Sequence, residues 1–223
     1  MKKKIYNKIG RLVGMLAITA LFVACDEHRD FLDTAMKPCH ILCTDGKVLS
    51  VSAFRESEKQ PIAVVFHINH DENTEGNGYA VYLWDLEPLA FADSIGVKQN
   101  TSADIAALDG FENTFALLDA RETSSPLAEK VFDMWRYGQS AYVPSVAQMR
   151  LLYHAKEQIN PVIKMCGGDT LSVEADDCWY WTSTEVNEQQ TAKAWLYSMG
   201  SGTIHDTPKI QAHKSRAIIT LRD

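Results

Sequence analysis

The sequence has few basic residues for its size, and this scarcity excludes one class of partner. Lys and Arg together number 22 against 29 Asp and Glu, which gives a formal net charge of −7. Five of the basic residues lie before residue 25, in a segment that we expect to be removed. The remaining chain then has 17 basic against 29 acidic side chains, a net charge of −12. Because binding to a phosphate backbone requires clustered Lys and Arg, we expect no nucleic-acid partner.

The N-terminus lacks an apolar run long enough to cross a bilayer. Its uncharged run, residues 12–24, has 13 residues, whereas a membrane-spanning helix needs roughly 20. The run follows a basic start, Met1-Lys2-Lys3-Lys4, and stops at Cys25. This pattern is typical of a secretory signal, so we predict that residues 1–24 are a signal peptide and take no part in the fold.

The motifs of common enzyme and metal sites are also missing. There is no G-x-S-x-G elbow, no phosphate-binding glycine loop and no H-E-x-x-H pair. The cysteines form no C-x-x-C pair, and His67 and His70 are spaced to point to opposite faces of a strand. An acidic cluster between residues 169 and 177 is read as a solvated loop, with a calcium loop as the alternative. We predict a protein that is not an enzyme and needs no metal or cofactor.

The residues around Cys25 resemble a lipobox, the site at which a bacterial cysteine is acylated and becomes the new N-terminus. The run is Leu21-Phe22-Val23-Ala24-Cys25, with Phe22 where the usual pattern has Leu. The resemblance implies a protein anchored to the membrane through fatty acyl chains on Cys25, since several chains give stable anchoring. Ordinary cleavage after Ala24 is the alternative.

The segment after Cys25 bears on location. Asp26-Glu27-His28-Arg29-Asp30 resembles the acidic segment that directs some Gram-negative lipoproteins to the cell exterior, and a solvated tether is the equal alternative. We expect an outer-membrane lipoprotein of the cell envelope that is exposed at the surface. Residues 25–38 would be a polar tether, and residues 39–223 a single domain.

Four further cysteines in an exported chain are compatible with two disulfides. Cys166 and Cys178 enclose a segment with Gly167-Gly168 that can fold back, so we predict a bridge between them, worth about 3 kcal/mol on the loop-entropy model. Cys39 and Cys43 would lie roughly 13 Å apart in an extended strand, so they can pair only across a turn.

Short-range patterns predict a mixture of strands and helices. Asp45-Gly46 between apolar runs predicts a hairpin with a type I′ turn over 41–49, and residues 62–68 and 79–84 predict a second hairpin. Ser125-Pro126 and the box Ser145–Gln148 each open a helix, and Asn160-Pro161 restarts a short helical turn. Residues 86–123 have no clear periodicity. Strands return at 178–182, 194–199, 203–205 and 216–221.

The order of four motifs resembles the Lcl C-terminal domain family, which has a C-type-lectin-like fold and occurs in bacterial surface proteins. The resemblance implies an α+β domain with two helices packed against antiparallel strands, in adhesins and exported lipoproteins. It covers residues 109–221 best. The motifs are Asp109-Gly110-Phe111-Glu112-Asn113-Thr114, Tyr142-Val143-Pro144-Ser145, Trp179-Tyr180-Trp181-Thr182-Ser183-Thr184-Glu185, and Ala194-Trp195 with Arg216-Ala217-Ile218-Ile219.

The candidate ligand surface consists of Trp179, Trp181, Glu185 and Trp195, because aromatic rings offer a large contact area for a sugar or a peptide. In a strand Trp179 and Trp181 share one face, so packing in the core is the alternative reading, with Trp179 the more exposed. The leading hypothesis is a lipid-anchored recognition or adhesion domain whose ligand is a glycan or a protein. The alternative is a structural or accessory subunit of a surface assembly such as a pilus.

Overall fold

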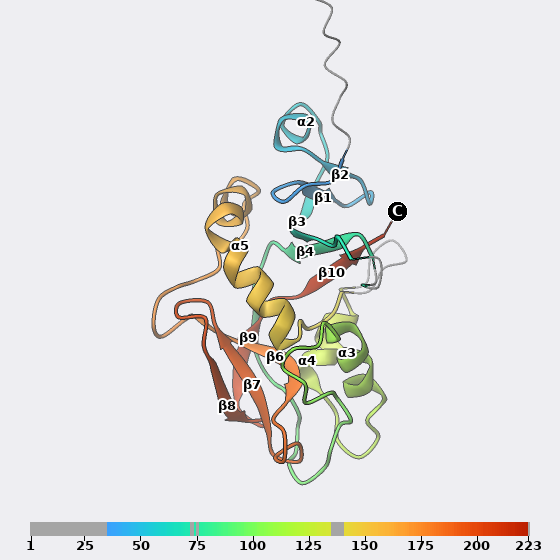
Figure 1. Ribbon diagram of the computed structural model, residues 1–223, viewed down its shortest axis with the longest axis vertical. Helices are drawn as coiled ribbons and strands as arrows, with labels where there is room; N and C mark the ends of the chain where they lie inside the picture. Colours follow the sequence, from blue (N-terminus) through green and yellow to red (C-terminus); the bar gives the residue numbers. More distant parts are fainter. Residues whose placement is uncertain (1–34, 72–73, 75, 135–140, 223) are drawn as a thin grey trace, which may run out of the picture. The chain divides into compact units, whose positions relative to one another are not determined.

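The computed structural model describes residues 35–71, 74, 76–134 and 141–222 (Figure 1). Cys25, the lipobox, most of the predicted tether and Trp135 lie outside the described residues. The helices are α2 (Val51–Arg55), α3 (Gly110–Asp119), α4 (Pro126–Phe132) and α5 (Val146–Met165). The strands are β1 (Ile41–Cys43), β2 (Val48–Leu49), β3 (Pro61–Ile68), β4 (Gly78–Tyr82), β5 (Leu86–Ala90), β6 (Trp179–Glu185), β7 (Lys193–Ser198), β8 (Ile204–Pro208), β9 (Ala212–Ser215) and β10 (Ile218–Leu221).

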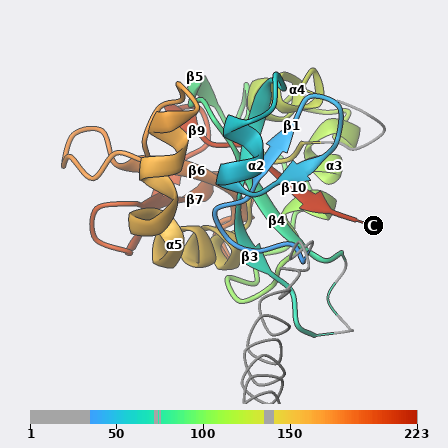
Figure 2. The ribbon, with the colours of Figure 1, turned by 90° about the horizontal axis from the view of Figure 1, so that it is seen from above.

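The described residues from Met36 onward form one compact unit whose largest sheet is five-stranded and antiparallel. Its strand order is β10-β4-β3-β1-β2, so the C-terminal strand lies beside β4. Alternate residues of β3 face opposite sides. Val64 and Phe66 pack against α5, whereas Ala63 and Val65 pack on the side of α3 and α4. Helices therefore cover both faces of the sheet, as Figure 2 shows.

The predicted hairpin over 41–49 is confirmed, but its predicted turn type is wrong. Strands β1 and β2 pair in antiparallel register, with Ile41 opposite Leu49. Gly46 has a positive φ of 81°, whereas Asp45 does not, so the turn is not type I′. The Gly46 N–H donates to the Cys43 carbonyl, and the Cys43 N–H donates to the Lys47 carbonyl. This is the three-residue loop in which a glycine in the left-handed region follows an ordinary turn.

Helix α5 is longer than the sequence indicated. The capping box is confirmed, because the Ser145 Oγ accepts from the Gln148 N–H and the Gln148 Oε1 accepts from the Ser145 N–H. The helix runs through Pro161 to Met165 instead of restarting there. Its buried face includes Leu152, Ile159 and Ile163, each of which contributes roughly 1.5–3 kcal/mol on burial. Burial on both sides of Pro161 outweighs the one donor that proline removes.

The strands outside the five-stranded sheet form two smaller sheets, and most of them come from the C-terminal part of the chain. Strands β6, β7 and β8 form an antiparallel sheet, and β5 pairs with β9. The helix predicted at Ser125-Pro126 is confirmed as α4, with Ser125 as N-cap. Within 86–123, where no periodicity stands out, the structure places β5 and α3. The fold is α+β, as expected. Among the helices that the structure describes, none has the length and apolarity needed to cross a membrane.

Candidate functional site

Trp181, a member of the predicted ligand surface, is a core residue. It is fully buried, and its Nε1–H donates to the Leu89 carbonyl at 3.0 Å. Its ring meets Phe91 and His213 edge-on, with centroids 5.6 and 5.4 Å away. A side chain this enclosed has no face left for a ligand, so the prediction is wrong for Trp181, and the packing alternative holds.

Trp179 and Trp195 are half-buried and lie on opposite sides of the β6–β7 sheet. Trp179 packs on the cluster that includes Trp181, and its ring lies edge-on to His205 at 5.9 Å. Trp195 packs on the other cluster, with Tyr180 and Tyr197. Since the sheet separates them, these two tryptophans do not form one surface. Each of them keeps part of its side chain exposed to solvent.

Glu185, the fourth predicted residue, is buried at the end of β6. Its carboxylate contacts the ammonium of Lys209, and only 1% of its surface is exposed. The sequence analysis placed Glu185 on the candidate ligand surface, and a carboxylate this enclosed is not open to a ligand. The partner lies 24 positions away in the loop after β8, and no local pattern indicates it.

The predicted disulfide between Cys166 and Cys178 is absent from the structure, where the four cysteines in its described part are free thiols. Cys178 lies directly before β6, and its Sγ is 3.2 Å from the Ser198 Oγ. Cys166 caps the C-terminus of α5, and burial and the nearby Cys43 raise its pKa. The two thiols are thus held by different elements. Helix α5 extends through Pro161 to Met165, so Cys166 is fixed at its C-terminus.

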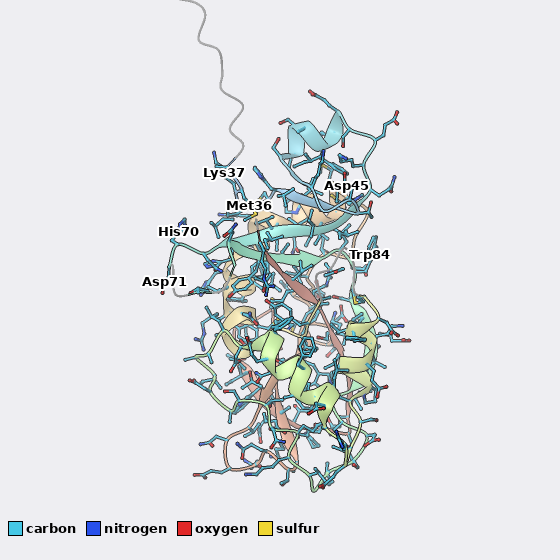
Figure 3. All side chains as sticks on the ribbon, turned by 90° about the vertical axis from the view of Figure 1, so that its right-hand side faces the viewer. Met36, Lys37, Asp45, His70, Asp71 and Trp84 are labelled. Atoms are coloured by element: carbon cyan, nitrogen blue, oxygen red, sulfur yellow. The ribbon has the colours of Figure 1, made fainter. Side chains whose placement is uncertain are left out.

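The acidic loop and the histidine pair carry other contacts. Asp177 pairs with Lys214 at 2.7 Å, and this hydrogen bond lowers the pKa of the Asp177 carboxyl. His67 stacks on Tyr79, and burial lowers the pKa of its imidazole. His70 lies at the periphery beside Asp71 (Figure 3). Among the described residues, no three His, Cys, Asp or Glu side chains gather as a metal site.

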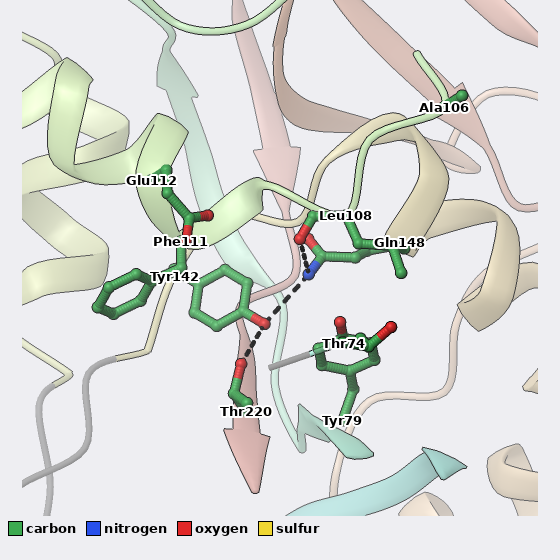
Figure 4. A pocket seen from close by; sticks show the side chains of 9 residues that line it. All are labelled: Thr74, Tyr79, Ala106, Leu108, Phe111, Glu112, Tyr142, Gln148 and Thr220. Atoms are coloured by element: carbon green, nitrogen blue, oxygen red, sulfur yellow. Dashed lines mark hydrogen bonds between the residues drawn. The ribbon is translucent and has the colours of Figure 1, made fainter. Parts of the chain in front are cut away.

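A pocket of about 340 Å³ opens where β4, β10, α3 and the start of α5 meet (Figure 4). It was not foreseen from the sequence. Its lining is mostly uncharged and combines apolar, hydroxyl and amide groups, with a single carboxylate. The lining residues are Thr74, Tyr79, Ala106, Leu108, Phe111, Glu112, Tyr142, Gln148 and Thr220. The lining thus offers apolar surface together with hydroxyl and amide groups that can form hydrogen bonds with a bound group.

A chain of hydrogen bonds forms the inner wall of the pocket. The Tyr142 hydroxyl lies 2.8 Å from the Thr220 Oγ1, and the Gln148 Nε2 donates to the Tyr142 oxygen at 3.2 Å. The same Nε2 lies 3.4 Å from the Leu108 carbonyl. Burial raises the pKa of Tyr142 well above its usual range, so its hydroxyl stays protonated at neutral pH. The wall therefore presents neutral hydrogen-bonding groups.

Four apolar side chains line the pocket or lie next to a residue that lines it, and we call them the apolar rim: Ile105, Leu108, Phe111 and Phe115. Ile105, Leu108 and Phe115 are 38%, 39% and 41% exposed. Phe111 and Phe115 are one helical turn apart on α3, with ring centroids 4.7 Å apart. Clustered exposed apolar residues next to a pocket are typical of a protein-contact surface.

Some of the residues that build this site belong to motifs identified in the sequence. Gly110 and Phe111 belong to the first motif of the resemblance, and Tyr142 belongs to the second. Gly110 lies so close to the start of α5 that an added Cβ would be 2.7 Å from the Val143 carbonyl and 2.8 Å from the Ser145 nitrogen. The glycine thus lets α3 abut α5, and this contact forms one side of the pocket. Their convergence was not visible because they lie some thirty positions apart.

Comparison with known proteins gives a fold likeness. No protein-family model matches the chain, and no curated protein matches it in sequence. Among solved structures, it is similar to a fimbrial protein from Bacteroides ovatus, with a TM-score of 0.67 and 15% sequence identity. The likeness covers 83% of this chain and 49% of the other, so the chain spans about half the length of that protein.

Proposed function

We propose that this chain is a subunit of a fimbria-like assembly on the cell surface. The observation that carries the proposal is the likeness in fold to a fimbrial protein over most of the chain. That likeness supports the assembly alternative over the free-standing adhesion domain that the sequence put first. The expected signal peptide and the acyl anchor at Cys25 are consistent with it, because such a subunit must leave the cytosol.

The apolar rim supports the proposal from the chain's own chemistry. Leu108 and Phe115 expose large apolar surface beside a pocket whose wall offers neutral hydrogen-bonding groups. Burial of apolar area drives most protein association, and polar groups in the contact set its specificity. A neighbouring subunit that inserts an apolar side chain into the pocket would bury both. The contact would place α3 at the interface.

Crosslinking in the native host tests the assembly. Intact cells treated with a mild crosslinker should yield the chain in a stoichiometric complex that survives denaturing purification. The double variant Leu108→Ser/Phe115→Ser should lose the complex while its circular dichroism stays that of the wild type. Ile210→Ser is the matched control, because Ile210 is 52% exposed in the loop after β8. Recovery of the wild-type chain alone would refute the proposal.

The anchor at Cys25 is part of the proposal and has its own test. Metabolic labelling with a fatty-acid analogue should mark the wild type and leave the Cys25→Ala variant unlabelled. Protease treatment of intact cells should cleave a surface-exposed chain and spare a periplasmic one. Label retained by Cys25→Ala would contradict the lipobox resemblance, whatever the outcome for the assembly.

Recognition of a glycan or protein ligand, with a C-type-lectin-like architecture of the Lcl type, is the second candidate. The half-buried ring of Trp179 beside His205 favours it, since a partly exposed aromatic face can stack on a sugar. Binding on a glycan array that falls on Trp179→Ala, in a folded protein, would support this role. Binding that is unchanged would exclude Trp179 as the contact.

A further inference from the structure

Three polar side chains from distant segments meet in the interior at the end of β6. Gln99 precedes α3, Glu185 ends β6, and Lys209 follows β8. Each is at most 1% exposed. The Lys209 ammonium contacts the Glu185 carboxylate and lies 3.2 Å from the Gln99 Oε1. The amine is therefore within hydrogen-bonding reach of both the carboxylate and the carboxamide oxygen.

This cluster is incompletely satisfied as an ion pair. In the described part of the chain, the Glu185 Oε2 and the Gln99 Nε2 are buried and have no hydrogen-bond partner. The Phe91 ring lies 5.3 Å from the Lys209 Nζ, so one side of the amine is apolar. Burial lowers the pKa of Lys209, although the contact with Glu185 opposes this. Burial thus favours the neutral amine, which is a nucleophile.

We propose that Lys209 and Gln99 become joined by an isopeptide bond, with Glu185 transferring the protons. Glu185 accepts a proton from the ammonium, and the free Nζ attacks the Gln99 Cδ. The bond between Cδ and Nε2 then breaks. Of the three ammonium hydrogens, one stays on the new amide nitrogen, and two pass through Glu185 to Nε2, which leaves as ammonium. Glu185 returns to a carboxylate, charge is conserved, and no oxidant or other reactant is needed.

The backbone around the cluster holds the reacting groups in place. The Gln99 N–H donates to the Glu185 Oε1 at 3.1 Å. The Lys209 carbonyl accepts from the Phe91 N–H at 2.9 Å, and its own N–H donates to the Ala192 carbonyl at 3.0 Å. The Lys209 Nζ already contacts the Gln99 Oε1, so a movement of the side chains alone brings Nζ onto Cδ. Holding two reacting groups together in this way makes a slow intramolecular reaction effective. The reaction also removes the orphaned Nε2 donor from the interior.

The bond would tie together segments 110 positions apart, so that α3, α4, α5 and three strands lie within one covalent loop. Such a link goes beyond the proposed function and does not depend on it. In a chain anchored at one end and pulled at a partner, it would keep the enclosed elements together under load.

Peptide mapping by mass spectrometry decides the matter on the folded wild-type chain. The expected product is a pair of peptides, one with Gln99 and one with Lys209, whose joint mass is lower by one ammonia than their sum. Lys209→Arg should abolish the link, because a guanidinium is not a nucleophile. Lys193→Arg is the matched control, since Lys193 also pairs with a carboxylate, Asp206, but at the surface.

Two results would overturn the assignment. One is a folded wild type in which both peptides appear unlinked, because the groups would then sit together without reacting. The other is a link from Lys209 to Glu185 with loss of one water, because the carboxylate would then be the acyl donor. The peptide map of the wild type tests the proposal without any variant. If Lys209→Arg does not fold, the wild-type result still decides whether the link exists. Loss of the crosslinked cellular complex would not affect this map.

Discussion

Replacing Arg216 by Met should destabilise the protein more than replacement of any exposed cation. Arg216 is fully buried and donates three hydrogen bonds. Its Nε donates to the Asp85 Oδ1 at 2.6 Å, Nη1 to the Tyr82 carbonyl at 2.9 Å, and Nη2 to the Asp169 carbonyl at 2.7 Å. The guanidinium thus joins the end of β4, the segment before β5 and the loop after α5.

The magnitude follows from what the substitution leaves behind. Removal of one partner from a buried charged pair typically costs 3–5 kcal/mol. Without Arg216, Asp85 would still have a charged partner, because the Lys214 Nζ lies 3.2 Å from its Oδ2. In addition, 19% of the Asp85 side chain is exposed to solvent. The two carbonyls lose a charged donor inside the protein. We therefore expect the lower end of the range, about 3 kcal/mol, which corresponds to a fall in Tm of roughly 6–12 °C for a chain of this size.

Urea denaturation followed by tryptophan fluorescence measures this loss, since Trp181 is buried in the native core and becomes solvated on unfolding. The midpoint should fall while the slope with urea stays constant, which would show that the native state and not the unfolded state has changed.

Lys130→Met is the control, because the Lys130–Glu87 pair is exposed and 3.7 Å apart. A surface substitution of this kind should change the free energy of unfolding by about 0.5 kcal/mol or less. Equal losses for Lys130→Met and Arg216→Met would refute the reasoning, because burial would then make no difference.

Three further predictions concern packing, capping and protonation. Gly110→Ala should cost about 1–3 kcal/mol, measured by urea denaturation, because its Cβ would press on the backbone at Val143 and Ser145; an unchanged midpoint would contradict the close approach. Ser145→Ala should cost about 1 kcal/mol or more by the same assay, because it removes the N-cap of α5 and the hydrogen bond that the Ser145 hydroxyl donates to the Ala107 carbonyl, and Ser145→Thr, which keeps the hydroxyl, should restore most of it. Burial, with the nearby His205, lowers the pKa of His213, so the unfolded state binds its proton first and stability falls as the pH drops below about 6.5. The Tm of His213→Gln should therefore fall less than that of the wild type between neutral pH and pH 5, and parallel falls would exclude this histidine.

The elements that the sequence predicted are those whose cause is local. The hairpin at Gly46 and the N-caps at Ser125 and Ser145 each depend on residues within four positions of one another. The turn type at 45–46 was wrong because Asp-Gly also fits a turn in which the glycine alone has positive φ. That choice is made by the register of β1 on β2 and not by the dipeptide.

Helix α3 and its part in the pocket were missed because their cause is tertiary. The buried positions of α3 are Gly110, Asn113, Thr114 and Leu117, at helical spacing but mostly not apolar. A hydrophobic pattern therefore does not reveal the helix. Thr114 bonds to the backbone at Val143, which shows that contact with the start of α5 buries this polar face. The exposed Phe115 lies on the opposite side and forms part of the apolar rim.

The candidate ligand surface was chosen because aromatic residues are frequent there in the sequence. A high local frequency of aromatic residues does not determine whether their side chains are exposed. Trp179 and Trp181 share one face of β6 as predicted, yet the neighbouring elements of the fold determine which ring is enclosed. Trp181 is enclosed because Phe91 and His213 close over it. Glu185 is enclosed because a lysine arrives from another loop.

By itself, the sequence determined the acidic charge, the N-terminal leader pattern, the main hairpins and the helix caps, because these depend on composition or on neighbours along the chain. Only the tertiary structure decided that α5 runs unbroken through Pro161, that a pocket opens beside α3, and that Lys209 meets Gln99 and Glu185 in the interior. The physical reason is that such contacts join residues up to 110 positions apart, where burial outweighs local preference and leaves no periodic trace in the sequence.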